Sequence, residues 1–256
     1  MLFKPTNPIS HRLARLAFTA ACVSALIVSV AGPLHRFLGV DVDAVIGLFR
    51  YGFYVAAGSI ALALATIVPT RPGDRRRGFV AAFLALVIGG AAAWAPLMLF
   101  VQAHDAPRIN DVSTDTSDPP PLVTTLHMRG DAATPPAYPG KAAAELQHQA
   151  YPDIAPIVLA VSPAEAFRKV DAVATEMGWE VVARVPGAGR GDGRLEAIDT
   201  SQWFGFHDDV VVRIRPDGTG SRIDIRSKSR VGRADLGANA HRIRAFISKL
   251  KALPSS

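Results

Sequence analysis

The first hundred residues contain three long stretches without a charged side chain. They cover residues 16–34, 51–70 and 78–103. A helix of about 20 apolar residues crosses the roughly 30 Å of hydrocarbon in a bilayer. Three such stretches so close together are not typical of the buried helices of a soluble protein. The pattern predicts three transmembrane helices within residues 1–103, surrounded by a lipid bilayer.

The charges between these stretches predict their orientation. The N-terminal segment carries three basic residues and no acidic one, and the second loop carries four arginines and one aspartate. The first loop has two arginines balanced by two aspartates. The positive-inside rule then places the N-terminus and the second loop in the cytoplasm. We expect a bacterial inner-membrane protein whose residues after Ala103 are periplasmic. A signal peptide cleaved near Ala31 is an alternative for the first stretch.

The remainder divides into an irregular segment and a regular one. Residues 104–150, here called the strap, are rich in Pro and Asp, and we expect a linker-like structure there. From residue 151 onward the periodicity predicts regular elements. The strands are expected at 156–161, 179–185, 194–201, 208–215 and 221–230, and the helices at 163–177 and 235–251. This order predicts an α+β domain over 151–256, with an antiparallel sheet and helices packed on one side.

Composition narrows the function classes. The formal net charge is +6, but residues 1–103 hold nine basic and three acidic side chains, whereas residues 104–256 hold 19 of each. The excess therefore lies in the membrane region, and we expect no nucleic-acid partner. A single cysteine, Cys22, excludes an intrachain disulfide framework. We expect no cofactor.

Three consecutive residues, His207, Asp208 and Asp209, could form an acid–base group because neighbouring carboxylates shift each other's pKa. Consecutive strand residues point to opposite faces, however. Asp208 would share the buried face of Val210 and need an arginine partner, while Asp209 would face outward with Arg213. We favour a structural ion pair for Asp208.

The segment 227–233 resembles an anion cradle, since it combines hydroxyl and cationic side chains with a following helix N-terminus. The ligand-binding candidates are Arg226, Ser227, Ser229, Arg230 and Asn239. Asp235 argues against this site, because a carboxylate at the N-cap occupies the same amide donors. We expect Asp235 to be structural.

The strap begins with an oxygen-rich stretch over residues 110–118. Calcium requires six to eight oxygens, but the stretch lacks the calcium-loop glycine, and Leu122 stands where a closing glutamate would be. We expect no metal and a turn-rich segment in which Asp111 and Asp115 are structural.

Residues 203–206 place three aromatics beside a glycine. Core packing is the first expectation for them, and a lip at the bilayer interface is the alternative.

The charge of the exported half is asymmetric. Residues 104–189 have a net charge of −5 and residues 190–256 of +5. We therefore predict that Asp111 and Asp115 of the strap pack near Arg226, Arg230 and Arg242, with Ile109 and Val112 in the core. A mobile linker is the alternative.

Four ordered strings carry a family resemblance. They are INDVSTDT at 109–116, YPDI at 151–154, WFGFHDD at 203–209 and DIRSKSRVGRADLGANA at 224–240. Over residues 107–252 the chain resembles the domain-of-unknown-function family fourteen-ninety-nine, and the three spans ahead resemble its membrane-anchored bacterial members. The resemblance implies domain limits and a membrane setting, and it supplies no catalytic residues.

Four functions remain open. The favoured one is a non-catalytic membrane protein whose periplasmic domain binds a partner protein or an amphiphile such as a lipid. The alternatives are an acid–base or hydrolytic enzyme using His207, Asp208 and Asp209, a scaffolding subunit of a membrane complex, and a metal-dependent sensor built on the strap.

Overall fold

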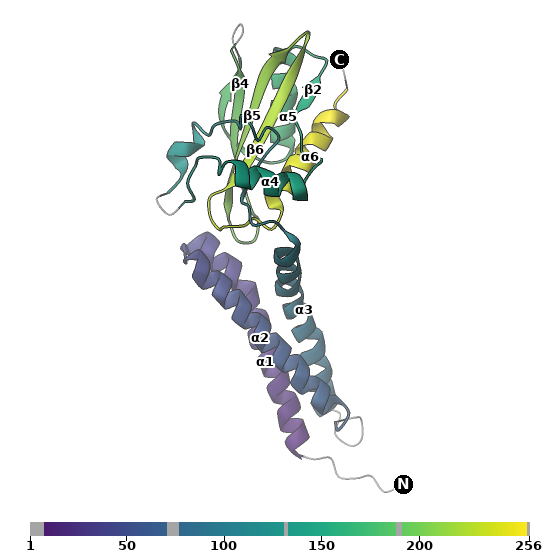
Figure 1. The fold of residues 1–256 in the computed structure, drawn as a ribbon. Coiled ribbons are helices and arrows are strands. Elements are labelled where there is room, and N and C mark those ends of the chain that lie inside the picture. Colours follow the sequence, from purple (N-terminus) through teal and green to yellow (C-terminus); the bar gives the residue numbers. More distant parts are fainter. Residues whose placement is uncertain (1–7, 71–76, 131–132, 188–190, 255–256) are drawn as a thin grey trace. The chain divides into compact units, whose positions relative to one another are not determined.

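The computed structural model describes residues 8–70, 77–130, 133–187 and 191–254 (Figure 1). The chain forms two compact units, one of residues 1–101 with 203–205 and one of residues 102–202 with 206–256.

The first unit is helical. It contains α1 (Pro8–Leu38), α2 (Val42–Ile67) and most of α3 (Arg77–Asp105). All three helices are long and apolar enough to cross a membrane, which confirms that the three predicted stretches are helical. The second helix begins well before the charge-free stretch, because Asp41 caps it by accepting hydrogen bonds from the amides of Asp43 and Ala44.

Small side chains bring these helices together. Ala17, Ala21, Ala63 and Ala85 form a buried cluster drawn from all three helices. Ser24 Oγ of α1 donates a hydrogen bond of 2.8 Å to the carbonyl of Gly52 in α2. Close backbone approach and such interhelical hydrogen bonds are typical of helix association in a bilayer.

The second unit is built on an antiparallel sheet. Its strands are β1 (Asp111–Ser113), β2 (Ile157–Leu159), β3 (Glu180–Val185), β4 (Gly193–Thr200), β5 (His207–Asp217) and β6 (Gly220–Ser229). Their order is β1-β6-β5-β4-β3, and β2 also pairs with β6. Both short strands therefore lie along the outer edge of β6.

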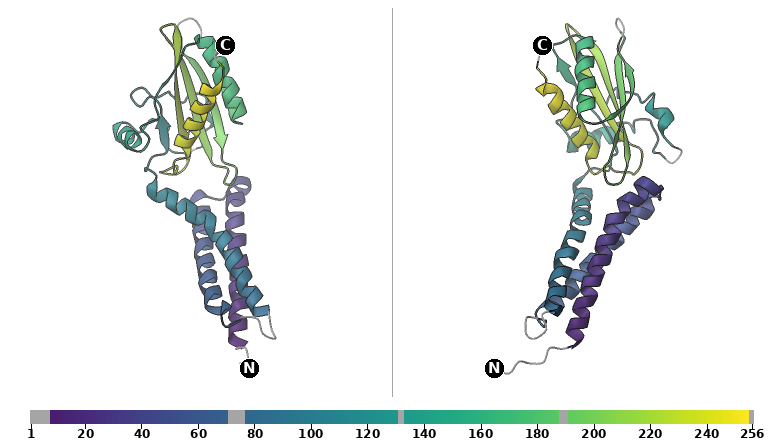
Figure 2. Two further views of the ribbon diagram at one scale, coloured as in Figure 1. Left: turned by 90° about the vertical axis from the view of Figure 1, so that its right-hand side faces the viewer. Right: turned by 180° about the vertical axis from the view of Figure 1, so that it is seen from behind.

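One face of the sheet carries α5 (Pro163–Glu176) and α6 (Ala238–Ala252), as Figure 2 shows. The core between them includes Val210, Val212 and Ile214 of β5. The predicted α+β architecture, with helices packed on an antiparallel sheet, is confirmed. The last helix begins at Ala238 rather than near Asp235, because Gly237 before it is left-handed, with φ of 85°.

The strap covers the other face of the sheet. It contains β1, the 3₁₀ turn η1 (Thr125–Met128) and α4 (Lys141–Ala150). Gln147 of α4 fixes it to β1, since its side chain accepts from the Ser113 amide at 3.0 Å and donates to the Ser113 carbonyl at 2.7 Å. Ile109 and Val112 lie in the core, as predicted. The strap is therefore docked along these contacts.

Candidate functional site

A layer of charged side chains fills the space between the sheet and the strap. We call it the charged layer. Its members are Asp111, Asp115, Asp118, Arg129, Arg194, Glu196, Asp209, Arg213, Arg215, Arg222, Asp224, Arg226, Lys228 and Arg230. It arises because β4, β5 and β6 place alternate residues on the face away from α5 and α6.

Asp111 occupies the β6 end of this layer. Its two carboxylate oxygens accept from Arg226 Nε and Nη2 at 2.9 and 2.8 Å. Lys228 Nζ donates to the same carboxylate at 3.0 Å. Asp111 and Lys228 are cross-strand partners, and both side chains are almost completely buried. The predicted contact between Asp111 and Arg226 is confirmed.

Asp209 is the second buried carboxylate of this region. It accepts from Arg230 Nε and Nη2 at 2.9 and 2.7 Å and from Arg129 Nη1 of the strap. The expectation that Asp209 faces outward is wrong, because the strap covers its face of the sheet and leaves the residue 0% exposed.

Asp115 and Asp118 hold the other half of the layer. Asp115 binds Arg222 Nη2 at 2.7 Å, and Asp118 binds Arg213 Nη1 at 3.0 Å. Burial alone would raise the pKa of Asp115, but the amides of Asp118 and Ser117 and the two guanidinium groups lower the pKa by more. Asp115 thus lies against the predicted basic strand, through an arginine that the prediction did not name.

Glu196 of β4 connects the layer to the strap backbone. Its carboxylate accepts from the amides of Val123, Thr124 and Thr125 at 2.9–3.1 Å, and from the Thr125 hydroxyl at 3.0 Å. Burial raises the pKa of Glu196, but these hydrogen bonds outweigh burial and hold the pKa below its usual value. Sequence reasoning did not identify this residue.

Arg242 lies on the opposite face of the sheet, so its predicted contact with the strap aspartates is wrong. It binds Asp208 through Nη2 at 2.5 Å and Asp199 through Nε at 2.6 Å. Asp208 is 6% exposed. The structure therefore gives Asp208 the arginine partner that the strand pattern predicts, and this arginine comes from α6.

The three acid–base candidates point in different directions. Asp208 faces α6 and Asp209 faces the strap, each in its own ion pair. His207 is exposed at the start of β5, where its Nδ1 lies 2.9 Å from Thr200 Oγ1. Burial of the ring and the nearby Arg230 lower the pKa of His207. The two carboxylates do not converge on one cleft.

The five ligand-binding candidates also divide between the two faces. Asn239 on α6 accepts from Ser227 at 2.7 Å and donates to Ser229 at 3.0 Å. Arg226 and Arg230 point into the charged layer instead. A ligand-binding role for these five residues stays a prediction.

Asp235 occupies the amide donors at the start of α6. It accepts from the amides of Gly237 and Asn239, each at 2.9 Å. Burial raises the pKa of Asp235. Its carboxylate thus takes the place that an anion would occupy at this helix terminus.

The aromatic residues at 203–206 do not pack in the described core of the second unit, contrary to the first expectation. Trp203 is 51% exposed, and Trp203, Phe204 and Phe206 are absent from the buried core of the second unit as far as the structure describes it.

In the described parts of the chain, no group of three His, Cys, Asp or Glu residues is placed to hold a metal ion.

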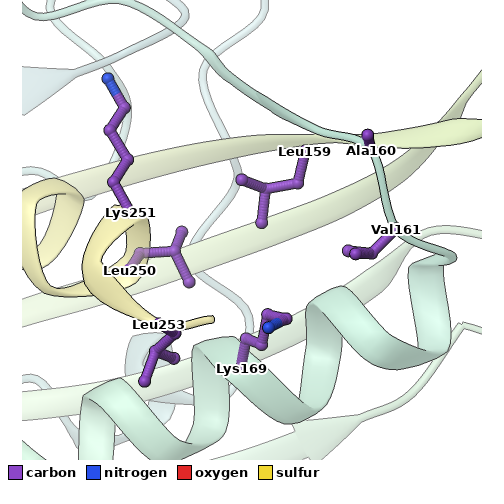
Figure 3. A pocket seen from close by; sticks show the side chains of 7 residues that line it. All are labelled: Leu159, Ala160, Val161, Lys169, Leu250, Lys251 and Leu253. Carbon is purple, nitrogen blue, oxygen red and sulfur yellow. The ribbon is translucent and has the colours of Figure 1, made fainter. Parts of the chain in front are cut away.

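A partly open cavity of about 160 Å³ lies between β2, α5 and α6 (Figure 3). Its lining residues are Leu159, Ala160, Val161, Lys169, Leu250, Lys251 and Leu253. Lys169 is 9% exposed, and its Nζ donates to the carbonyl of Pro254. Sequence reasoning missed Lys169, although it occupies the buried face of its helix with Ala166 and Val173, an unusual position for a lysine.

Comparison with protein-family models matches residues 111–250 to DUF1499, described as a protein of unknown function. A search of curated proteins found no match.

Proposed function

The chain belongs to the DUF1499 family, and we propose that it is a multi-pass protein of the bacterial inner membrane whose periplasmic domain binds an anionic amphiphile. The family carries no known activity that would assign a reaction. The membrane setting is supported by the three long apolar helices. The ligand class follows from the cavity between β2, α5 and α6.

One observation carries this proposal: a nearly buried ammonium group stands in a cavity whose lining combines polar surface with leucine and valine side chains. Four of the lining residues are leucine or valine, and Lys169 and Lys251 are the cationic ones (Figure 3). Of its three N–H donors, Lys169 Nζ gives one to Pro254 and has Glu165 only at 3.9 Å. A carboxylate or phosphate head would fit this ammonium group, and an alkyl chain would fit the leucines.

The size of the cavity limits what it can hold. A cavity of roughly 150 Å³ lined by apolar side chains is large enough for benzene. The 160 Å³ here therefore accommodate a head group with a short alkyl segment, and the remainder of a longer chain would extend through the open side. We expect affinity to depend on Lys169 because its charge is the least solvated in the cavity.

Native mass spectrometry of the protein extracted with its lipids tests this proposal. We expect the wild-type protein to retain an anionic amphiphile that Lys169→Met loses by tenfold or more. Because the three helices also retain lipids, the informative quantity is the difference between variants. Lys249→Met is the matched control, since Lys249 lies on α6 but pairs with Glu176 on the surface. Equal adducts in all three proteins would contradict the proposal.

A partner protein is the second candidate. Val123, Leu126 and Met128 in and beside η1 are 38–44% exposed, so the strap presents three apolar side chains to its surroundings here. Exposed apolar side chains of this kind mark contact sites when they are contiguous. In the same experiment, a retained polypeptide mass that Leu126→Asp removes would favour this candidate.

The acid–base alternative has no comparable support, since Asp208 and Asp209 lie on opposite faces.

The proposed orientation predicts the location of the C-terminus. We expect an alkaline phosphatase fused after Ser256 to be active and a reporter that requires the cytoplasm to be inactive there. The reason is the excess of arginine and lysine before the first span and between the second and third. A fusion in the second loop is the control with the opposite expectation. An inactive phosphatase after Ser256 with an active cytoplasmic reporter would overturn the orientation.

A further inference from the structure

The segment between β4 and β5 is a short closed turn that carries aromatic side chains. We call residues 201–206 the aromatic loop. The Ser201 amide donates to the Phe206 carbonyl at 2.9 Å, and the Phe206 amide donates to Ser201 Oγ at 2.9 Å. These two hydrogen bonds close the loop and leave Trp203 and Phe204 within its turn.

The tip of the aromatic loop belongs to the helical unit. Residues 203–205 group with the three helices of the first unit and not with the sheet. Within that unit, the Phe204 ring packs edge-on against Phe49 of α2, with ring centroids 5.7 Å apart. A Cβ added at Gly32 of α1 would overlap the Trp203 ring. The tip therefore lies against the C-terminal part of α1 and the N-terminal part of α2.

The contact with Gly32 fixes the level of Trp203 along α1. Gly32 is two residues before the end of the charge-free stretch 16–34, or about 3 Å at the rise of an α-helix. Arg36 follows half a turn beyond this stretch, and its Cγ would lie 2.8 Å from a Cβ at Gly205. Trp203 thus lies where the apolar part of α1 gives way to charge. In a bilayer this level is the membrane–water interface, where tryptophan is enriched.

The start of the second span shows the same type of boundary. Tyr51 is the first residue of the second charge-free stretch and is 61% exposed. The guanidinium carbon of Arg50 lies 5.9 Å from the centre of its ring. Aromatic rings together with arginines at the ends of apolar helices are typical of the interfacial region. The aromatic loop adds a tryptophan to this end of the first unit from a distant part of the chain.

The indole of Trp203 is only partly covered by protein. It packs on Gly32, yet the residue is 51% exposed. An indole combines an apolar ring with an N–H donor, so it suits a surrounding that is apolar at one end and wet at the other. We propose that the aromatic loop is a lipid contact of this chain, in which Trp203 lies in the interfacial layer of the bilayer at the end of α1. The inference rests on the membrane-spanning part of the proposed function and is independent of the amphiphile cavity.

Quenching by brominated lipids tests this position. The full-length protein is reconstituted in phosphatidylcholine vesicles whose acyl chains carry bromine either near the glycerol or near the chain end. Trp94→Phe retains Trp179 and Trp203, whereas the double variant with Trp203→Phe retains Trp179 alone. The difference between the two proteins is the Trp203 signal, and the core residue Trp179 is left unchanged. We expect this signal to lose more intensity to the shallow bromines than to the deep ones.

The other two tryptophans are the matched controls. Trp94 is 63% exposed near the middle of the charge-free stretch 78–103, so deep bromines should quench it more strongly. Trp179 is buried in the α+β core and should not respond to either lipid.

The pattern of quenching separates the two proposals. If the lipids quench Trp94 but not Trp203, the interfacial contact is overturned and the membrane-spanning part of the proposed function stands. If neither tryptophan is quenched, both are overturned. Trp203 that water-soluble acrylamide quenches and brominated lipid does not would lie in water or against another protein, and stronger quenching by the deep bromines would contradict the interfacial level.

Discussion

Asp111→Asn should lower the free energy of unfolding of the second unit by about 3–5 kcal/mol. The carboxylate is 0% exposed and accepts from both Arg226 and Lys228. Asparagine keeps the size of the side chain but removes the charge, so that two buried cations lose their shared carboxylate. Removing one partner of a buried ion pair is far more destabilising than removing a surface pair, which contributes about 0–1 kcal/mol.

Urea unfolding of the full-length protein in detergent measures this effect. Trp179 is a suitable reporter because it is buried in the α+β core, stacked on Phe246 with ring centroids 5.5 Å apart. Trp94→Phe and Trp203→Phe would leave it as the single tryptophan. A loss below 1 kcal/mol for Asp111→Asn would show that the charged layer does not hold the strap.

Two further substitutions calibrate this result. Asp208→Asn should cost about 2–4 kcal/mol, and less than Asp111→Asn, because Arg242 keeps Asp199 as a partner. Asp153→Asn is the surface control, since Asp153 pairs with Arg244 where both are largely exposed. We expect its cost to be at most about 1 kcal/mol.

Much of the fold could be predicted from the sequence because local patterns determine it. Charge-free stretches longer than a bilayer is thick identify the helices of the first unit. Alternation along β5 and β6 assigns Val210 and Ile225 to the core and Arg226 to the opposite face. Ser162, whose Oγ accepts from the Glu165 amide, is the N-cap that marks the start of α5.

The covering of the second sheet face could not be predicted in the same way. The strap has weak periodicity, and its contacts join residues about a hundred positions apart, such as Asp111 and Lys228. Periodicity shows that Asp209 points away from the core, but it does not show that another segment lies over it. The charge asymmetry of the two halves indicated docking, yet it did not determine which arginine binds which aspartate.

Acid should destabilise the second unit, and Glu196 should account for much of this effect. Hydrogen bonds from the strap lower the pKa of Glu196 in the folded state, against the opposing effect of burial. A carboxyl group whose pKa is lowered by folding stabilises the folded state. This stability is fully present above the pKa of the unfolded state, and it is lost as pH falls through the pKa of the folded state. Asp115, whose pKa is also lowered in the folded state, acts in the same direction. The raised pKa of Asp235 has the opposite effect on stability. The folded state binds this proton at a higher pH than the unfolded state does, so acid stabilises the fold at this residue.

Glu196→Gln separates this contribution from the others. At neutral pH it should cost about 2–4 kcal/mol, since an amide cannot replace a carboxylate that accepts three backbone amides and a hydroxyl. The difference from wild type should shrink as pH falls through the lowered pKa of the folded state, because the wild-type carboxyl group then becomes protonated and neutral like the amide. Urea midpoints with the Trp179 reporter between pH 7 and pH 3 measure this convergence. Asp235→Asn is the control, because its effect on stability should change with pH in the opposite direction. If the wild type is more stable than Glu196→Gln by the same amount at every pH, the ionised carboxylate is excluded as the source of the difference.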